Sequence, residues 1–332
     1  MSTRRGLLTL ATLTAFGIAS VVALGRTRGA DDALQVLRET DPRWLVGCAA
    51  LELLSLLAYA RALRAFVEVD RSLAIGVSEA RRLMFASLGG ARLVAVGGAG
   101  GLAVMYWGFR QLGSDRQVAL ARVLGLNILV FGIFGLIGWA AAVARLVVPP
   151  IGTGVPLVLA IAWSLAIPAC VAAALRLRNL GDATRIPSEH PTRREQGVLA
   201  VSGGLKMVRD IALRARHHRR MLLAGATYWL ADIGCLALSI LAVGAGIGPV
   251  EICLAYVTGY VAMLAPLPTG GFGAVEAAVT ASLTVVGVSI SVALASVAIW
   301  RAFNFWLPTV PALVALARLP KLGRDLRAES SS

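Results

Sequence analysis

The sequence predicts an all-α polytopic membrane protein with about six full spans and two glycine-broken re-entrant hairpins in inverted repeats. Three observations lead to this fold class. Of the 332 residues, 58% are hydrophobic and only 15% are charged, whereas soluble domains carry about 25% charged residues. Six apolar runs come close to the roughly 20 residues that a helix needs to cross a bilayer. Two further apolar regions are each interrupted by glycine.

The six long apolar runs are the expected full spans. Arg4 and Arg5 precede the first run, so the beginning of the chain also resembles a twin-arginine export signal. The many apolar runs that follow favour a retained helix over a cleaved signal. In chain order the runs are Leu7–Leu24, Trp44–Leu63, Val118–Ala144, Val155–Leu175, Met221–Val243 and Ser291–Leu316.

The two glycine-broken regions are too short in each half to cross the bilayer alone. Each half has about 13 to 16 residues, or roughly 20 to 24 Å of helix at 1.5 Å per residue. Two half-helices that meet at a Gly/Pro break predict a re-entrant hairpin. The halves are Leu83–Val96 and Gly100–Leu112 around the first break, and Val250–Ala265 and Phe272–Val286 around the second.

The distribution of Lys and Arg predicts the orientation of the chain. With six crossings and two hairpins that return to the side they started from, 25 basic residues lie on one side and five on the other. The richer side is expected to be the cytoplasm, which places both termini there. The expected organisation is a single integral membrane domain over residues 1–332. It contains a first repeat half (44–175), a basic cytoplasmic linker (176–220) and a second repeat half (221–316).

A shared pattern relates the two broken regions to each other. Both contain GGxG, then a glycine, then VALA after four intervening residues. The first copy is Gly97-Gly98-Ala99-Gly100, Gly113 and Val118-Ala119-Leu120-Ala121, and the second is Gly270-Gly271-Phe272-Gly273, Gly287 and Val292-Ala293-Leu294-Ala295. Under the predicted topology the two hairpins start from opposite sides, so the repeats are inverted. Such repeats place a substrate site near the midplane of the bilayer.

The second break carries a motif that is characteristic of a known family. Pro266-Leu267-Pro268-Thr269-Gly270-Gly271-Phe272-Gly273 with Glu276, then Gly287, Arg301 and Trp306-Leu307-Pro308, resembles the signature of the lysylphosphatidylglycerol synthase transmembrane (flippase-like) family. The resemblance implies a bacterial cytoplasmic (inner) membrane protein that moves a polar-headed lipid between leaflets, best known for aminoacylated phosphatidylglycerol. We expect no soluble aminoacyl-transferase domain in this chain, so the resemblance gives no support for synthase activity.

Three ionisable residues of the second half are expected inside the membrane. They are Asp232, Glu276 and Arg301. Each costs about 2.5 to 3.5 kcal/mol at mid-helix unless it has a partner or a use. One interpretation is a structural ion pair, such as Asp232 with Arg301. The other is substrate binding, in which Arg301 holds a lipid phosphate in a bidentate manner while Glu276 or Asp232 receives an ammonium group or a proton.

The glycines of the second break also allow two interpretations. Free N–H groups at Gly270, Gly271 and Gly273 could bind a phosphate oxygen at the start of a half-helix. Glycine also lets a hairpin turn and pack closely, and Glu276 could cap the arm by accepting from the N–H of Gly273. In the first repeat, three membrane-embedded polar residues are candidate secondary substrate contacts: Glu52, Arg92 and Asn127, the last of which aligns with Arg301.

The basic linker contains a second pattern. Apolar residues recur at helical spacing at Val198, Val201, Leu205, Val208 and Ile211, with Lys206, Arg209, Arg214 and Arg216 on other faces. This pattern predicts an amphipathic helix on the cytoplasmic leaflet that meets anionic lipid. The alternative is that the charged face is solvated and serves only to set the orientation of the chain in the membrane.

The expected function is flippase-like translocation of a phospholipid or glycolipid. The alternatives are an integral-membrane transferase with Glu276 or Asp232 as base, and a non-transporting partner of a separately encoded synthase. The chain has no GxxxxGK[ST] loop for ATP, no HExxH motif and no histidine in its apolar runs. We therefore expect no catalytic residue, metal, cofactor or nucleic-acid partner. The four cysteines are expected to be small core residues.

Overall fold

The computed structural model describes residues 30–70, 73–93, 98–147, 157–183, 193–264 and 273–330. Within these ranges every regular element is a helix. The expected span Leu7–Leu24 lies outside the described residues, as do Gly270 and Gly271.

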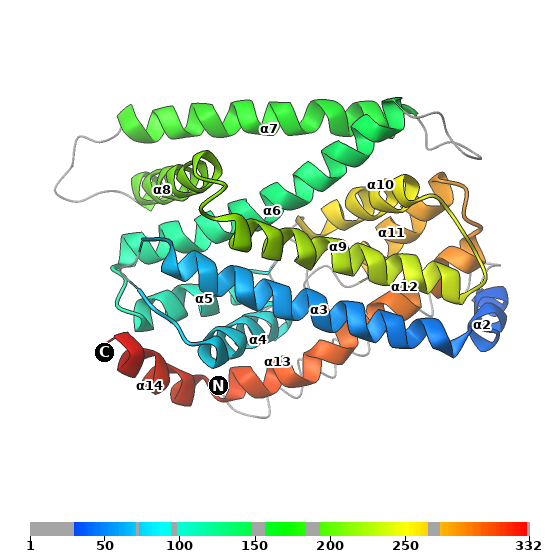
Figure 1. Ribbon diagram of the computed structural model, residues 1–332, viewed down its shortest axis with the longest axis horizontal. Helices are drawn as coiled ribbons and strands as arrows, with labels where there is room; N and C mark the ends of the chain where they lie inside the picture. Colours follow the sequence, from blue (N-terminus) through cyan, green and yellow to red (C-terminus); the bar gives the residue numbers. More distant parts are fainter. Residues whose placement is uncertain are drawn as a thin grey trace.

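Five helices of the described part are long and apolar enough to cross a membrane. They correspond to the five expected spans that lie within it, which confirms the all-α polytopic membrane fold. α3, α7 and α9 run along the long axis of the molecule, and α6 crosses it obliquely (Figure 1). The five are α3 (Pro42–Val67), α6 (Arg116–Val147), α7 (Leu157–Ala183), α9 (Arg219–Ala242) and the continuous helix formed by α12 (Ile290–Arg301), the π-helical turn η4 (Ala302–Trp306) and α13 (Leu307–Ala317).

The two glycine-broken regions each form a pair of short helices whose arms pack on each other. Figure 1 shows the two pairs toward opposite ends of the molecule. Their placement relative to a bilayer stays a prediction. The first pair is α4 (Val77–Leu93) with α5 (Ala99–Gln111), and the second is α10 (Pro249–Tyr260), extended by the 3₁₀ turn η2 (Val261–Leu264), with α11 (Ala274–Val285).

Glycines with positive φ mark equivalent points in the two pairs. Gly98 (φ 78°) precedes α5 and Gly273 (φ 85°) precedes α11, while Gly113 (φ 91°) and Gly287 (φ 97°) follow these arms. A side chain with Cβ is strained in this region of φ, so glycine is required where the chain turns. The structure therefore pairs Gly98 with Gly273, two residues from the pairing that the GGxG pattern predicts.

The two halves of the chain pack against each other mainly through three pairs of helices. α3 and α9 form the most extensive helix contact, α4 packs on α13, and α10 packs on α6. Small residues allow the close approaches, because a Cβ at Gly89 would lie 2.5 Å from the carbonyl oxygen of Ala312. The first arm of each hairpin thus contacts the long helix of the other half.

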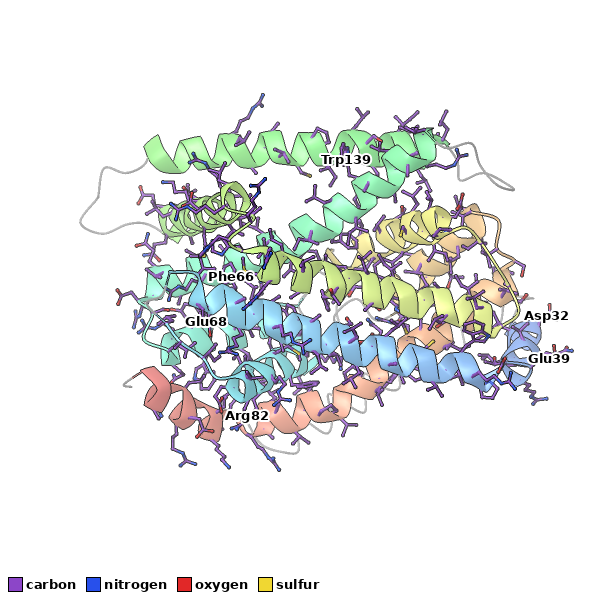
Figure 2. All side chains as sticks on the ribbon, in the orientation of Figure 1. Asp32, Glu39, Phe66, Glu68, Arg82 and Trp139 are labelled. Atoms are coloured by element: carbon purple, nitrogen blue, oxygen red, sulfur yellow. The ribbon has the colours of Figure 1, made fainter. Side chains whose placement is uncertain are left out.

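Short and polar helices close the ends of the molecule. Figure 2 shows Asp32 and Glu39 at one end of the long helices and Glu68 toward the other. At that second end the C-terminal helix is held by an ion pair between Arg82 and Asp325, at 2.7 Å. The end elements are α2 (Ala30–Arg38), the 3₁₀ turn η1 (Glu68–Asp70), α8 (Arg193–Leu213) and α14 (Leu319–Ser330).

α8 occupies the stretch where the sequence predicts an amphipathic helix. It packs against α6 and α7. Ile211 is fully buried, so at least part of the apolar face is covered by protein rather than by lipid. Contact of its basic residues with anionic lipid stays a prediction.

Candidate functional site

Asp232 lies near the middle of α9 and is fully buried. Its carboxylate accepts three hydrogen bonds, from the Tyr256 hydroxyl at 2.6 Å, the Trp300 indole at 2.6 Å and the Asn304 amide at 2.8 Å. All three donors are neutral, and together they occupy both carboxylate oxygens. A buried carboxylate needs such donors because it has lost its water.

Arg301 forms its ion pair with Glu276 rather than with Asp232. The Arg301 Nε donates to Glu276 Oε1 at 2.5 Å, and the side chains are only 6% and 14% exposed. The predicted pairing of Asp232 with Arg301 is therefore wrong. Adjacent residues of a helix point about 100° apart, so Trp300 faces Asp232 while Arg301 faces Glu276.

Glu276 also caps the helix that carries it. Its Oε2 accepts from the Gly273 N–H at 2.6 Å, at the start of α11. The capping interpretation of Glu276 is thus realised. Because the second oxygen holds Arg301, the cap also fixes the position of the guanidinium.

Arg92, from the first hairpin, reaches the last long helix. Its Nη1 donates to Thr309 Oγ1 at 2.6 Å and its Nη2 to the Asn304 carbonyl at 3.3 Å. In a regular α-helix that carbonyl would accept from residue 308, but Pro308 has no N–H. The proline leaves the carbonyl free for Arg92, which thereby joins the two halves through neutral acceptors.

A cavity of about 90 Å³ brings the charged residues of both halves together. Its polar lining includes Glu52, Arg92, Arg301 and Asn304. Phe305 lies between the cations, with its ring centroid 4.6 Å from Cζ of Arg92 and 4.8 Å from Cζ of Arg301. The remaining lining residues are Leu56, Tyr59, Leu88, Ala91, Gly98, Tyr228, Tyr260 and Met263.

The other predicted site residues have different positions. Asn127 donates to the Val123 carbonyl of its own helix at 2.8 Å and does not line the cavity. It is therefore not brought to Arg301 by the alignment of the repeats. Gly270 and Gly271 lie outside the described residues, and Gly273 serves as the capped turn.

Several site residues escape prediction from the sequence. Asn304 and Thr309 contact the charged groups, and three tyrosines line the cavity. Asn304 lies three residues after Arg301, which places both on one helix face, and this spacing was an available signal. The tyrosines carry no such signal, because aromatic residues are common in any apolar core.

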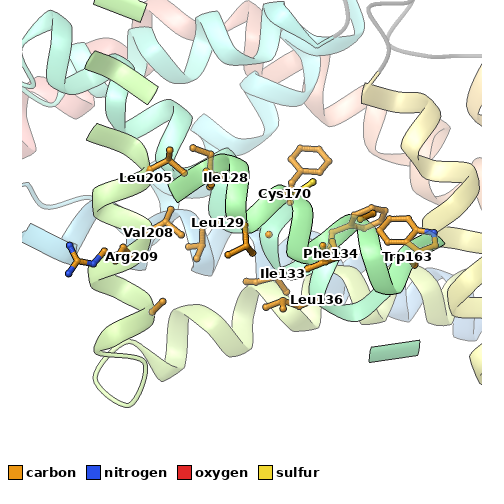
Figure 3. Close-up of a pocket in the computed structure, with 18 of the residues that line it drawn as sticks. Ile128, Leu129, Ile133, Phe134, Leu136, Trp163, Cys170, Leu205, Val208 and Arg209 are labelled. Atoms are coloured by element: carbon orange, nitrogen blue, oxygen red, sulfur yellow. The ribbon is translucent and has the colours of Figure 1, made fainter. Parts of the chain in front are cut away.

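A second, much larger cavity lies between α6, α7 and α8. It has a volume of about 1030 Å³. The close-up in Figure 3 shows leucine, isoleucine and aromatic side chains around it, with Arg209 at one margin. The expected burial of all four cysteines is wrong for Cys170, which is exposed and lines this cavity, because α7 stands away from the rest of the bundle.

Aromatic rings form the wall between the two cavities. Phe134 lines the apolar cavity and Tyr260 lines the polar cavity, and their ring centroids are 5.9 Å apart. The buried Trp229 packs on both, at 4.7 Å from Phe134 and 5.4 Å from Tyr260. A polar chamber and an apolar chamber thus lie next to each other.

Comparison with known proteins identifies the family. A family model described as the lysylphosphatidylglycerol synthase TM region matches residues 7–312, and a search of curated proteins found no match. The matched region contains four of the five long helices and most of the fifth, both broken pairs and every residue of the polar cavity. The chain therefore belongs to the lysylphosphatidylglycerol synthase transmembrane-region family.

Proposed function

We propose that the chain moves a polar-headed lipid between the leaflets of a bacterial cytoplasmic membrane. The observation that carries the proposal is the cavity that Glu52, Arg92 and Arg301 line together among apolar helices. Charges at this depth are costly, so a cavity that assembles them from both halves of the chain favours a transport site over a structural one.

The two chambers match the two parts of a lipid. A phosphate fits the guanidinium groups of Arg92 and Arg301, since arginine binds phosphate with paired N–H groups. The apolar cavity offers hydrocarbon chains a surface of matching polarity. Displacement of the aromatic wall around Trp229 would connect the chambers.

The two helical pairs are the parts of the fold that would allow alternating access. They lie toward opposite ends of the molecule (Figure 1), and equivalent glycines begin their second arms. If the repeats are inverted, rocking of one half against the other exposes the same site first to one side and then to the other.

Reconstitution in vesicles tests the proposal. Phospholipid that carries a fluorescent acyl chain is placed in both leaflets, and a membrane-impermeant reductant then bleaches the outer leaflet. Purified protein should speed the loss of the protected fraction at least tenfold over protein-free vesicles. Arg301→Ala should abolish this effect. The matched control Arg82→Ala, which removes an arginine with a half-exposed side chain far from the cavity, should keep it.

Other outcomes identify the alternatives. Covalent modification of the labelled lipid would indicate a transferase. Absence of movement together with co-purification of a lipid synthase would indicate a non-transporting partner. Either result would replace the proposal.

The ion pair of Arg301 and Glu276 allows a separate test of its role. Each single change, Arg301→Ala or Glu276→Gln, leaves one buried charge without its partner and should lower the free energy of unfolding by about 3 to 5 kcal/mol. The double variant removes both charges and should regain abundance. Under the proposal it stays inactive, because the phosphate ligand is missing. Recovery of transport in the double variant would show that the pair is only structural.

A further inference from the structure

The polar cavity contains a basic and an acidic side chain that form no ion pair with each other. Among the described residues, Arg92 donates only to the neutral acceptors Thr309 and Asn304. Glu52 is 2% exposed, and its Oε2 has no hydrogen-bond partner in the described part of the chain. Both residues line the same cavity. Two opposite buried charges that stay apart leave room for a group that would satisfy both.

Glu52 is the one acid of this site with a free oxygen among the described residues. The oxygens of Glu276 are held by Arg301 and by the Gly273 N–H. Those of Asp232 are held by three neutral donors. A cationic ligand would therefore meet Glu52, and not Glu276 or Asp232 as the sequence predicts.

Three tyrosines complete the surroundings of Glu52. Tyr59, Tyr228 and Tyr260 line the cavity, and their hydroxyls make no hydrogen bond to any described residue. The rings of Tyr59 and Tyr228 lie 5.0 Å apart. Aromatic rings attract ammonium groups through their π faces, and hydroxyl oxygens accept from N–H donors. A carboxylate among tyrosines is thus suited to an alkylammonium.

The charge balance around the cavity also favours a ligand that carries a positive group. Arg301 and Glu276 cancel each other as a pair. In the described part this leaves Arg92 against two acids, Glu52 and Asp232. A ligand that carries only phosphate would add negative charge to this excess of acids, whereas a head group that also carries a cation would not.

We infer that Glu52, Tyr59, Tyr228 and Tyr260 form an ammonium subsite beside a phosphate subsite at Arg92 and Arg301. The cavity then selects a head group that carries both charges over one that carries only phosphate. This inference rests on the proposed lipid translocation and assigns the residues that discriminate among lipids.

The test compares two lipids in the same protein preparation. Phosphatidylethanolamine and phosphatidylglycerol with the same fluorescent acyl chain differ in whether the head group carries an ammonium or a neutral hydroxyl. The wild type should move phosphatidylethanolamine at least fivefold faster. In Glu52→Gln, which keeps size and removes charge, the ratio of the two rates should fall close to one. The control Glu68→Gln changes an exposed glutamate outside the cavity and should keep the wild-type ratio.

The ratio separates selectivity from folding, because a misfolded fraction lowers both rates equally. A second variant, Tyr59→Leu, removes a ring without touching any charge and should also lower the ratio. An unchanged ratio in Glu52→Gln would overturn the subsite.

A binding measurement separates this inference from the proposed function. Glycerophosphoethanolamine and glycerophosphoglycerol are titrated into the full chain in detergent, with tryptophan fluorescence as the readout. The ammonium compound should bind at least fivefold tighter to the wild type and equally to Glu52→Gln. If this holds while no lipid moves in vesicles, the subsite stands and translocation fails. If lipids move but neither assay distinguishes the head groups, the subsite fails and translocation stands.

Discussion

The Asp232 carboxylate shows how a single buried residue organises its surroundings. Its three donors come from α9's neighbours, with Tyr256 on α10, Trp300 on α12 and Asn304 on the π-helical turn. One side chain therefore ties three elements to the centre of α9. Removal of any donor should weaken the packing of these elements as well as the local hydrogen bond.

Tyr256→Phe should lower the free energy of unfolding by about 1.5 to 3 kcal/mol, the range for hydrogen bonds to charged groups. The same change at Tyr106, whose hydroxyl makes no hydrogen bond within the described residues, serves as the control. Thermal or denaturant unfolding in detergent measures both variants. If Tyr256→Phe and Tyr106→Phe lower the free energy of unfolding equally, the hydrogen bond of the Tyr256 hydroxyl does not stabilise the protein.

The sequence identifies several residues that line the polar cavity, but it does not identify the acid that pairs with Arg301. Glu52, Arg92 and Arg301 are recognisable because charged residues in apolar runs are rare, and the structure does bring them into one cavity. The partner of Arg301 could not be read in this way. Asp232 and Glu276 both lie in apolar segments of the second half, and only the packing of helices that are distant in sequence decides which acid faces the guanidinium.

At the scale of elements, each helical pair depends on glycines that carry no side chain at the contact. A Cβ at Gly259 would lie 2.5 Å from Cα and 2.6 Å from the backbone nitrogen of Val279, on the opposing arm. Backbone atoms cannot move aside as a flexible side chain can. The arms of α10 and α11 can therefore approach this closely only with glycine at that position.

Gly259→Ala should separate the arms and lower the free energy of unfolding by about 1 to 3 kcal/mol, the usual range for overpacking. Gly132→Ala on α6 is the matched control, because a Cβ there meets no atom within 4 Å. Alanine in a helix interior favours folding by up to about 1 kcal/mol over glycine. Relative to the wild type, the melting temperature should fall in Gly259→Ala and rise in Gly132→Ala. A fall in both variants would show that close contact at Gly259 is not the cause.

The elements themselves are largely predictable. Long apolar runs predict the described spans because about 20 residues are needed to cross the bilayer, and the glycine breaks correctly divide α4 from α5 and α10 from α11. The π-helical turn Ala302–Trp306 was not predictable. Pro308 is visible in the local sequence, but the contact that Arg92 makes with the Asn304 carbonyl comes from a residue 212 positions away and is not.

At the scale of the whole molecule, the position of the two helical pairs determines how the site can be reached. They lie toward opposite ends (Figure 1), and the cavity is lined by residues of both halves, such as Arg92 and Arg301. If each pair dips into the bilayer from its own side, the site is the point where the two meet.

Cysteine labelling tests this arrangement. Single cysteines at Ala99, which begins α5, and at Ala274, which begins α11, are introduced after replacement of the four native cysteines. A membrane-impermeant maleimide should reach residue 99 from the cytoplasmic side and residue 274 from the opposite side. Reaction of both positions from one side would exclude oppositely oriented hairpins.

The packing of α4 on α13 imposes an order on biosynthesis. Arg92 lies 217 residues before its acceptor Thr309, and a ribosome that adds about 5 to 20 residues per second needs roughly 10 to 40 s to cover that distance. During this interval the first hairpin has been made, but the helix that receives its arginine has not. During synthesis the first hairpin, with Arg92, therefore stays at the membrane without its final partner. The bundle is complete only when the last long helix has been released from the ribosome.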